Sequence, residues 1–451
     1  RMLVVAKAGH EADVKAILEK WELQAATIGV VTDDGLYRVR EGDAVVCEVP
    51  GYPLVTGCPT YVREAREADE PRRLREWDPM SLEQAGGPAD PTQVLLRLLG
   101  SPNLADKSWI YRQYDSTVRT NTVEGPGGDA GVLRLRGTTK GIAATLDCNG
   151  RYCYLNPRRG GMQAVAEAAR NLACVGARPR AVTDNLNFGN PLKPEVYYQL
   201  SEAVEGIAEA CRRLDTPVTG GNVSLYNENP RGAIHPTPVI GMVGVLEDVT
   251  RRLTMGFRDP GDAIVLLGRN TAELGGSEYV KVVHGRVGGD APAVDLEAER
   301  SLIECLLELA GARLLRSAHD CSEGGLAICL AESALANNLR PLGVEVALED
   351  DLPGAPLLFG EAQGRALVSC APASVEAVLE VARRHGVPAA RIGVVGEAGG
   401  GFTVRTRSCP PIEAGVSELR EAWATAIPRM MERSPAAVEV EVEHPAPSAG
   451  G

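Results

Sequence analysis

The sequence predicts an α/β chain of the α+β kind, in which mixed sheets are covered by helices and one structural unit occurs twice. Three observations support this prediction. Short runs rich in Val, Ile and Leu alternate with longer segments whose apolar residues recur at helical spacing. One such pattern near the start of the chain recurs near its end. The composition, with 44% hydrophobic and 24% charged residues in 451 residues, is typical of a globular protein of about three domains.

The repeat is defined by two anchors. Arg1 aligns with Arg365, and the run Ile-Gly-Val-Val begins at Ile28 and again at Ile392, so both pairs are 364 residues apart without a gap. This indicates a duplicated unit, and the alternative is a chance match of two βα units. We expect a comparable portion, of roughly two domains, to precede Arg1 in a complete protein. In the first copy we expect a strand, a helix and a second strand over residues 2–6, 11–21 and 25–31.

Between the two copies, the sequence predicts a connecting region and two α/β patterns. The connecting region is rich in charge, Pro and Gly and has one expected helix, near 91–99. In the first pattern we expect strands over 132–135, 141–146, 180–183, 216–219 and 237–245, and helices over 161–172 and 194–214. In the second we expect strands over 263–268 and near Val344 and Ala366, and helices over 296–315 and 324–337.

The segment 219–228, TGGNVSLYNE, contains several groups suited to ligand binding. Gly220 and Gly221 would let the backbone approach an anion closely, and consecutive N–H groups would form an anion-binding nest. Asn222 offers a neutral oxygen to a hard cation, and Ser224 offers a hydroxyl to a phosphate or substrate. On its chemistry alone, a lone Gly-Gly-Asn run favours an ordinary turn without a ligand.

The segment 182–191, VTDNLNFGNP, places Asp184 at the carboxyl end of an expected strand, where α/β proteins bind ligands. Its carboxylate would suit a ribose, an adenine amino group or magnesium, and a turn-capping role explains it as well. Asp147 likewise ends a strand, and the run 158–161, Arg-Arg-Gly-Gly, opens a helix as phosphate seats do. The run 319–325, HDCSEGG, favours a Gly-rich helix start over a nucleophile, because no partner residues accompany it.

The composition argues against several classes of protein. A net charge of -13 disfavours binding to the negatively charged backbone of a nucleic acid. No stretch approaches 18 consecutive apolar residues, so no membrane span is expected. The 11 cysteines include no CxxC pair and indicate reduced, mostly buried thiols in a cytoplasmic protein. No P-loop, GxSxG or HExxH motif is present, and no residue is an obvious general base.

Together and in this order, the motifs resemble the phosphoribosylformylglycinamidine synthase family of the PurL type. VTDNLNFGNP and TGGNVSLYNE carry the resemblance, with LDCNGRYCYLNP and EAARNLACVGARP before them. It covers essentially the whole chain and includes YRQYD at 111–115 and HDCSEGGLA at 319–327. It implies a duplicated chain of AIR-synthetase-like A-type and B-type domains. The implied parts are the remainder of a first B-type domain (1–60), a connecting region (61–125), a second A-type domain (126–255), a second B-type domain (256–440) and a disordered tail (441–451).

The resemblance also implies a reaction and roles for particular residues. The family converts formylglycinamide ribonucleotide (FGAR), ATP and ammonia into the amidine, ADP and phosphate in purine biosynthesis. The ammonia comes from glutamine through a separate glutaminase subunit, and a small third subunit joins the complex. By position, Asp184 and Gly221 would bind ATP, Asn222 would ligate Mg²⁺ and Ser224 would contact the substrate. Asp147 and Asn171 would belong to a pseudo-symmetric second site.

The chain departs from the family pattern in one respect. It contains no segment like the family's catalytic histidine motifs, so we expect no catalytic residue here and no activity of the chain alone. Two alternatives remain: another ATP-dependent enzyme of the superfamily, such as an AIR synthetase or a selenophosphate synthetase, and a non-catalytic nucleotide-binding module. The duplication argues against the first. The presence of Asp184, Gly221 and Asn222 argues against the second.

Overall fold

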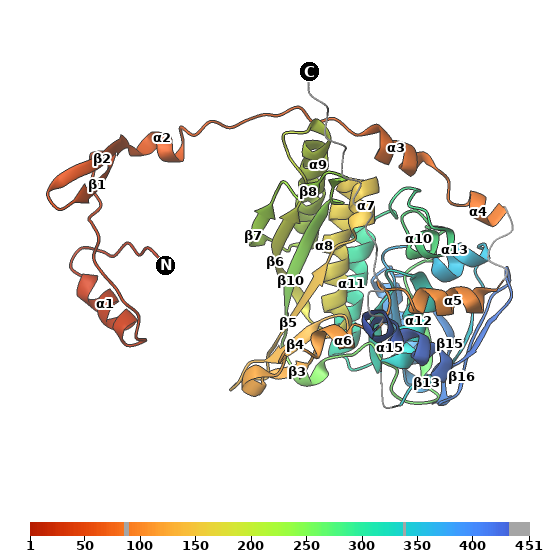
Figure 1. Cartoon of the computed structure of the whole chain (residues 1–451). Helices are drawn as coiled ribbons and strands as arrows, with labels where there is room; N and C mark the ends of the chain where they lie inside the picture. Colours follow the sequence, from red (N-terminus) through yellow and green to blue (C-terminus); the bar gives the residue numbers. More distant parts are fainter. Residues whose placement is uncertain (85–89, 337–339, 433–451) are drawn as a thin grey trace, which may run out of the picture. The chain divides into compact units, whose positions relative to one another are not determined.

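The computed structural model describes residues 1–84, 90–336 and 340–432 (Figure 1). The chain forms two compact units, Arg1–Val62 and Arg63–Gly451. The tail over 441–451, for which the sequence predicts disorder, lies outside the described residues. Within the part of the chain that the structure describes, no helix is long and apolar enough to cross a bilayer.

The first unit contains little secondary structure. It has a helix, an antiparallel hairpin and a second short helix: α1 (Glu11–Glu19), β1 (Leu36–Glu41), β2 (Ala44–Pro50) and α2 (Gly51–Val55). The expected helix is confirmed, but the strands expected over 2–6 and 25–31 are absent. A strand needs a neighbour to receive its backbone hydrogen bonds, and in residues 1–62, all described, β1 and β2 pair only with each other.

A six-stranded sheet with the order β3-β4-β5-β10-β6-β7 begins the second unit. Its neighbours are antiparallel except for β6 and β7, which run parallel and are connected by the long helix α9 (Pro194–Leu214). The strands are β3 (Thr122–Glu124), β4 (Gly131–Arg134), β5 (Gly141–Asp147), β6 (Arg178–Asn187), β7 (Val218–Ser224) and β10 (Thr237–Leu246).

Helices cover one face of this sheet (Figure 1). They are α7 (Gly150–Leu155), α8 (Pro157–Cys174) and α9. Val165, Ala168 and Leu172 of α8 share a buried core with Ala143 and Ile240 of the sheet. The periodicity of these apolar residues predicted the helix, and its first turn extends further back because Pro157 fits the N-terminal turn.

The glycines of the run 158–161 have a packing role in this helix pair. A Cβ atom at Gly161 would lie 2.5 Å from the carbonyl oxygen of Ala203, and α9 approaches α8 closely for this reason. Arg158 is paired with Glu209 of α9 at 2.8 Å. The features that suggested a phosphate seat therefore serve contacts between helices.

The opposite face of the sheet is open over its central strands. Leu133, Leu146 and Val243 are 46%, 74% and 40% exposed, while their neighbours Ala143 and Met242 on the helix side are buried. Alternation along the strands thus produces one covered face and one partly apolar open face.

A seven-stranded sheet with the order β12-β14-β11-β15-β13-β16-β17 forms the rest of the unit. Only β13 and β16 are parallel neighbours. The strands are β11 (Ala263–Leu267), β12 (Ser317–Asp320), β13 (Leu342–Ala347), β14 (Ala366–Cys370), β15 (Ala389–Ala398), β16 (Gly401–Arg405) and β17 (Ile412–Gly415). The helices are α10 (Glu278–His284), α11 (Leu296–Gly311), α12 (Gly325–Leu335), α13 (Gly354–Phe359), α14 (Val375–Arg384) and α15 (Val416–Glu432).

The connecting region contains more structure than the single helix expected. That helix, α5 (Pro91–Leu99), is confirmed: Asp90 caps it, and Leu95 and Leu98 are fully buried. The additional helices are α3 (Asp69–Glu76), α4 (Ser81–Gln84) and α6 (Ser108–Tyr111). α3 is highly charged, and α4 and α6 have only four residues each, so none of the three shows an apolar period. The remaining short elements are η1 (Val118–Thr120), β8 (Glu228–Asn229), β9 (Gly232–Ala233), η2 (Val249–Arg251) and η3 (Pro372–Ser374).

Candidate functional site

The four residues predicted to bind ATP, magnesium and substrate all lie on the parallel strands β6 and β7. The register pairs between these strands include Asp184 with Gly221, Asn185 with Asn222, and Asn187 with Ser224. Because side chains alternate along a strand, the predicted residues divide between the two faces of the sheet. Asp184 and Gly221 belong to the helix-covered face, and Asn222 and Ser224 to the open face.

On the helix-covered face, the Asp184 carboxylate lies over Gly221. A Cβ atom at position 221 would lie 2.0 Å from Asp184 Oδ1, so glycine is needed here to leave room for the carboxylate. Burial raises the pKa of Asp184. The pKa of the Cys211 thiol on α9 is raised by burial and further by the charge of Asp184. Asp184 does not end a strand as expected, because β6 continues to Asn187.

Asp184 also shares a transverse row with the second candidate site. Ile240 of β10 is the register partner of Asp184 on one side and of Asp147 on the other. Neighbouring strands are about 4.8 Å apart, so the backbones at Asp147 and Asp184 lie about 10 Å apart on the same face. The fold therefore brings two acidic side chains, far apart in sequence, to one level of the sheet.

On the open face, Asn222 is joined to an amide that the sequence analysis did not single out. Asn222 Nδ2 donates to Asn185 Oδ1 at 3.2 Å across the two strands. Asn187 Nδ2 donates to the carbonyl oxygens of Asn185 and Thr237 at 2.8 and 3.1 Å. With Nδ2 of Asn222 engaged as a donor, Oδ1 is the atom that this exposed side chain offers to a cation.

The turn after β7 is held against the turn after β6. The N–H of Phe188 donates to Ser224 O at 3.0 Å, that of Tyr226 to Gly189 O at 2.9 Å, and that of Asn227 to Phe188 O at 3.1 Å. Tyr226 has a φ of 62°, which is uncommon for a residue with a side chain. Such a conformation persists where surrounding contacts impose it, and these three bonds do so here.

The Gly-Gly-Asn run does not form the expected anion-binding turn. Gly220, Gly221 and Asn222 lie inside the extended strand β7, and neither glycine has a positive φ. The strand expected over 216–219 begins only at Val218, and its first residues are exposed because β7 is an edge strand. Parallel pairing with β6 explains the difference, because the ladder requires extended backbone. An edge strand still leaves backbone donors unpaired on its outer side.

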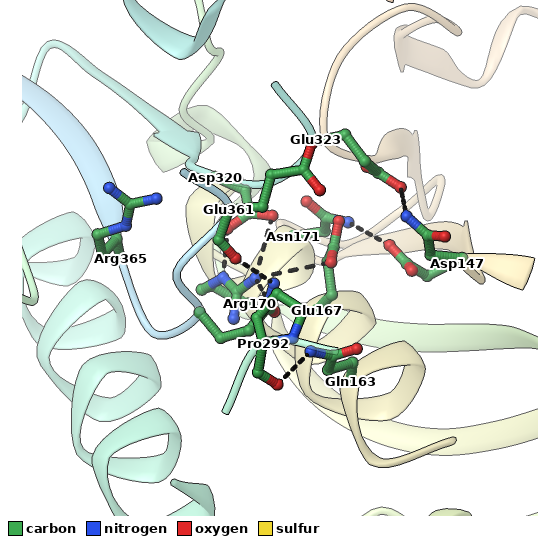
Figure 2. A network of polar contacts seen from close by, with 12 residues as sticks. Asp147, Gln163, Glu167, Arg170, Asn171, Pro292, Asp320, Glu323, Glu361 and Arg365 are labelled. Atoms are coloured by element: carbon green, nitrogen blue, oxygen red, sulfur yellow. Dashed lines mark hydrogen bonds and ion pairs between the residues drawn. The ribbon is translucent and has the colours of Figure 1, made fainter. Parts of the chain in front are cut away.

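The second candidate site is a pocket of about 310 Å³ lined by Asp147 and Asn171. Asn171 Nδ2 donates to Asp147 Oδ2 at 3.4 Å, and Figure 2 shows the amide facing the carboxylate. The structure therefore brings these two predicted residues together. Other charged residues of the lining are Asp106, Lys107, Asp129, Glu167, His319, Glu323 and Glu332.

Carboxylates dominate the electrostatics of this pocket. Burial raises the pKa of Asp147 well above its usual value, and the charges of Glu323 and Asp320 raise it further. Burial and the charge of Asp147 likewise raise the pKa of Glu167. Buried carboxylates that raise one another's pKa bind a cation favourably, because the cation stabilises their charged forms.

Arg170 is a fully buried cation beside this pocket (Figure 2). Its guanidinium donates to Asp320, to Glu299 Oε1 at 2.5 Å and to Gln363 Oε1 at 3.2 Å. These contacts join α8 to β12 and α11, so they connect the layers of the two sheets. Removing one partner of such a buried pair costs about 3–5 kcal/mol.

His319 holds another wall of the pocket. Its Nδ1 lies 2.8 Å from Asp129 Oδ1 and its Nε2 lies 3.1 Å from Glu332 Oε2. Burial by itself would lower the pKa of His319, but the two carboxylates hold it well above its usual value. The following glycines, Gly324 and Gly325, have positive φ values and begin α12. The predicted Gly-rich helix start is therefore confirmed.

The two candidate sites offer single oxygen ligands to a magnesium ion and not a complete set of protein ligands. No three His, Cys, Asp or Glu side chains in residues 1–84, 90–336 and 340–432 are arranged as a metal-binding group. Mg²⁺ commonly binds through one or two protein ligands together with waters and substrate phosphates, and Asn222 Oδ1 suits that arrangement. In the pocket, the buried Asp129 Oδ2 has no hydrogen-bond partner among the described residues, which also suits a cation.

Several residues of both sites were not identified from the sequence. Asn185 and Asn187 alternate along β6, and this period of two is the signal that places them on one face. Glu167 lies four residues before Asn171, which places both on one side of α8. Asn227 had no sequence signal beyond its presence in the segment 219–228.

Comparison with known proteins identifies related domains. The AIR synthase related protein N-terminal domain family matches residues 127–246, and the corresponding C-terminal domain family matches residues 259–405. The chain is 52% identical over 434 residues to the phosphoribosylformylglycinamidine synthase subunit PurL of Moorella thermoacetica, covering 96% of this chain and 58% of that protein. The PurL subunit of Chlorobaculum tepidum is 48% identical over 438 residues, covering 95% and 57%. The chain thus spans somewhat more than half the length of these relatives.

Solved structures share the fold. Thermotoga maritima PurL complexed with FGAR matches with a TM-score of 0.60 at 22% identity, covering 76% of this chain and 55% of that one. The same protein complexed with ATP matches with a TM-score of 0.57 at 24% identity, covering 76% and 54%. The predicted mixed α/β fold with AIR-synthetase-like domains is therefore confirmed. The chain belongs to the AIR synthase related proteins and is similar to the PurL subunits of phosphoribosylformylglycinamidine synthase.

Proposed function

We propose that this chain forms a nucleotide-binding and substrate-binding wall of a phosphoribosylformylglycinamidine synthase, an ATP-dependent ligase of purine biosynthesis. The observation that carries the proposal is the β6–β7 pair, where Asp184 and Gly221 lie in register on one face and Asn222 and Ser224 on the other. The names of the relatives and the FGAR and ATP complexes of Thermotoga maritima PurL support it.

The proposed reaction has two steps. The amide oxygen of FGAR attacks the γ-phosphorus of ATP and ADP leaves, and ammonia then adds to the activated carbon and phosphate leaves. Catalysis of this kind depends mainly on positioning and on electrostatic stabilisation. A bound magnesium ion would neutralise charge on the phosphates. In this chain, Asp184 and the backbone at Gly221 would bind ATP, Asn222 Oδ1 would hold the ion, and Ser224 would contact FGAR.

The acidic pocket is the proposed pseudo-symmetric second site. Asp147 and Asn171 would bind there, and the raised pKa of Asp147, caused by burial and by Glu323 and Asp320, supports a cationic or metal-bound ligand. Asp147 and Asp184 flank Ile240, so both sites lie on one row of the sheet. A ligand that binds the pocket should stabilise the chain against unfolding by an amount that rises with the logarithm of its concentration above Kd.

The proposal includes domains, partners and place of action. Its proposed partners are a glutaminase subunit that supplies ammonia and a small third subunit, and the PurLQS structure from Thermotoga maritima supports such an assembly. We propose that the chain acts in the cytoplasm and that nucleic acids are not among its partners. The proposed division is into 1–60, 61–125, 126–255, 256–440 and 441–451, with A-type and B-type domains over the third and fourth ranges.

The decisive experiment measures FGAR-dependent ADP release, with ammonia and magnesium, from a polypeptide extended upstream to the full length of the relatives. We expect turnover that falls at least about 100-fold on Asn222→Ala, because a ligand to the ion that neutralises the transferred phosphoryl group is lost. Asn229→Ala, an exposed asparagine on β8, is the matched control and should leave turnover unchanged.

Two outcomes would contradict the proposal. A folded, ATP-binding extended protein without FGAR-dependent turnover would assign the chain to another activity of the superfamily. Turnover by the isolated 451-residue chain would show that catalytic groups are present here after all.

A further inference from the structure

We propose that Asn227 holds the Ser224 hydroxyl as a hydrogen-bond acceptor, so that Ser224 recognises an O–H or N–H donor of the substrate and not a phosphate oxygen. This inference rests on the proposed function, in which Ser224 contacts FGAR. It concerns the direction of the hydrogen bond, which a hydroxyl in free rotation would leave open.

Four contacts define the geometry of the Asn227 side chain. Its Nδ2 donates to the carbonyl oxygens of Ser224 and Phe188 at 2.9 and 3.0 Å. Ser224 Oγ lies 3.1 Å from Nδ2 and 3.2 Å from Asn227 Oδ1. Asn227 and Ser224 are both half-buried, so these contacts are partly shielded from water.

The two carbonyl oxygens decide which way the amide points. A carbonyl oxygen can only accept, so the NH₂ group of Asn227 must face Phe188 O and Ser224 O, and the amide oxygen must face Ser224 Oγ. Asn227 Oδ1 can also only accept, so the Ser224 hydroxyl proton points to it. Where Asn227 Nδ2 also donates to Ser224 Oγ, the hydroxyl oxygen is the acceptor of that bond.

The backbone around these side chains keeps the arrangement in place. The turn carrying Asn227 is hydrogen-bonded to the turn carrying Phe188, and Tyr226 between Ser224 and Asn227 has a φ of 62°. A turn that imposes this conformation has little freedom to rotate the amide. The Ser224 hydroxyl is therefore presented with its proton already bonded and with lone-pair capacity left for a ligand.

This arrangement selects among the groups of the proposed substrate. Phosphate oxygens need donors and gain nothing from an oxygen whose proton is engaged. Ribose hydroxyls and amide N–H groups are donors and suit it. Both sources share the same chemistry, and analogues that lack one donor at a time distinguish them.

The test measures binding by calorimetry to the extended, full-length polypeptide. The probes are FGAR, its 2′-deoxy and 3′-deoxy forms, an N-methylated amide form and the dephosphorylated nucleoside. One donor-deleted analogue should bind about five- to tenfold more weakly than FGAR to the unchanged protein. The same analogue and FGAR should bind equally to Ser224→Ala, because the acceptor is then absent.

Different failures have different meanings. Two results would overturn the donor assignment while leaving the proposed function intact. In the first, Ser224→Ala lowers the affinity for FGAR and for every analogue equally. In the second, Ser224→Ala lowers the affinity only for probes that carry the phosphate. Absence of any FGAR binding by a folded protein would contradict the proposed function and this inference together.

Asn227 is tested as a positioning residue through a second comparison. Asn227→Ala frees the Ser224 hydroxyl and should reduce the discrimination between FGAR and the analogue about fivefold. In a Ser224→Ala background the same change should leave that discrimination unaltered, whereas a purely structural role would lower affinity equally for all probes. The Ser224→Ala measurements decide the proposal even where an Asn227 variant does not fold.

Discussion

The two copies of the repeat have related sequences and different structures. In the second copy, β14 (Ala366–Cys370) lies between β12 and β11, and all five of its residues are buried. In the first copy, the aligned Met2 and Val5 are 93% and 74% exposed. Ile28 of the shared Ile-Gly-Val-Val run is 82% exposed, whereas the aligned Ile392 in β15 is 8% exposed.

The difference separates local from non-local structure. A helix forms in both copies, as α1 and α14, because its hydrogen bonds close within the segment. A strand forms only in the second copy, where β11 and β13 lie beside β15 and receive its hydrogen bonds. An apolar run of strand character is therefore a strand only where the fold supplies a neighbour.

A charge placed in the aligned first strands should show the largest contrast. Val368→Asp buries an unpaired carboxylate in β14, at a fully buried position, and should destabilise the second unit by about 5 kcal/mol. Val4→Asp, its aligned and exposed counterpart, should change the free energy of unfolding by less than about 0.5 kcal/mol. Urea denaturation followed by circular dichroism measures both, and equal destabilisation by the two variants would break the comparison.

His319 should make the stability of the second unit, in which the second copy lies, depend on pH. It lies on β12, beside Leu367 of β14, and the carboxylates of Asp129 and Glu332 raise its pKa despite burial. With the folded-state pKa raised, its contribution is fully present below about pH 6.5 and is lost as the pH rises through the folded-state value. His319→Ala should cost about 3 kcal/mol at pH 6 and flatten this dependence.

The control for that measurement is His385→Ala. His385 is paired with Glu308 near the surface, where an ion pair contributes less than about 1 kcal/mol. Denaturation curves between pH 5 and 9 give the comparison. A slope with pH that persists in His319→Ala would assign the dependence to other groups.

The aligned glycines of the shared run should respond differently to one added methyl group. A Cβ atom at Gly393 would lie 2.2 Å from Glu345 O and 2.7 Å from Val346 Cγ2, whereas nothing lies within 4 Å of one at Gly29. Gly393→Ala should therefore lower the free energy of unfolding by about 2–3 kcal/mol, whereas Gly29→Ala should leave it unchanged. Thermal unfolding of the two variants tests this, and a stable Gly393→Ala protein would mean that β13 and β15 are farther apart.

The two helices should show the smallest contrast. Val378 of α14 is fully buried, and Val378→Ala should cost about 1–2 kcal/mol for the lost packing. The aligned Val14 lies in α1, which has no buried residues, so Val14→Ala should stay within about 0.5 kcal/mol. Circular dichroism and denaturation measure both effects. A cost at Val14 equal to that at Val378 would show that α1 packs against an apolar surface.

Several long helices and most strands of the second unit were predictable from period and length, whereas the 17-residue α15 and the shorter α7, α10 and α13 were not predicted. The helix over 194–214 and the helix over 91–99 have the predicted bounds, because their apolar residues recur along one face and a proline opens each. The helix expected over 296–315 ends at Gly311, where Arg313 adopts a φ of 56° and closes the turn. The surface helices of the connecting region carry no apolar period, so the sequence did not predict them.

The candidate sites were predictable only in part. The residue types of VTDNLNFGNP and TGGNVSLYNE predicted Asp184, Gly221, Asn222 and Ser224 as a set. Their division between two faces of one sheet follows from the register of β6 and β7, which no local pattern contains. The amide of Asn227 acquires its role only through carbonyl oxygens that the turn after β6 brings to it.

The sequence by itself predicted the family and the helices with an apolar period, because these depend on residue identity and on spacing along the chain, and the duplication stays a prediction. The tertiary structure alone decided that Gly220 and Gly221 lie in a strand and that Asp147 and Asp184 share one row of the sheet. It also decided that the runs 2–6 and 25–31 form no strands, whereas the runs aligned with them do. Strand pairing and buried charge networks join residues distant in sequence, so their free energy depends on which neighbours the fold supplies and not on the segment itself.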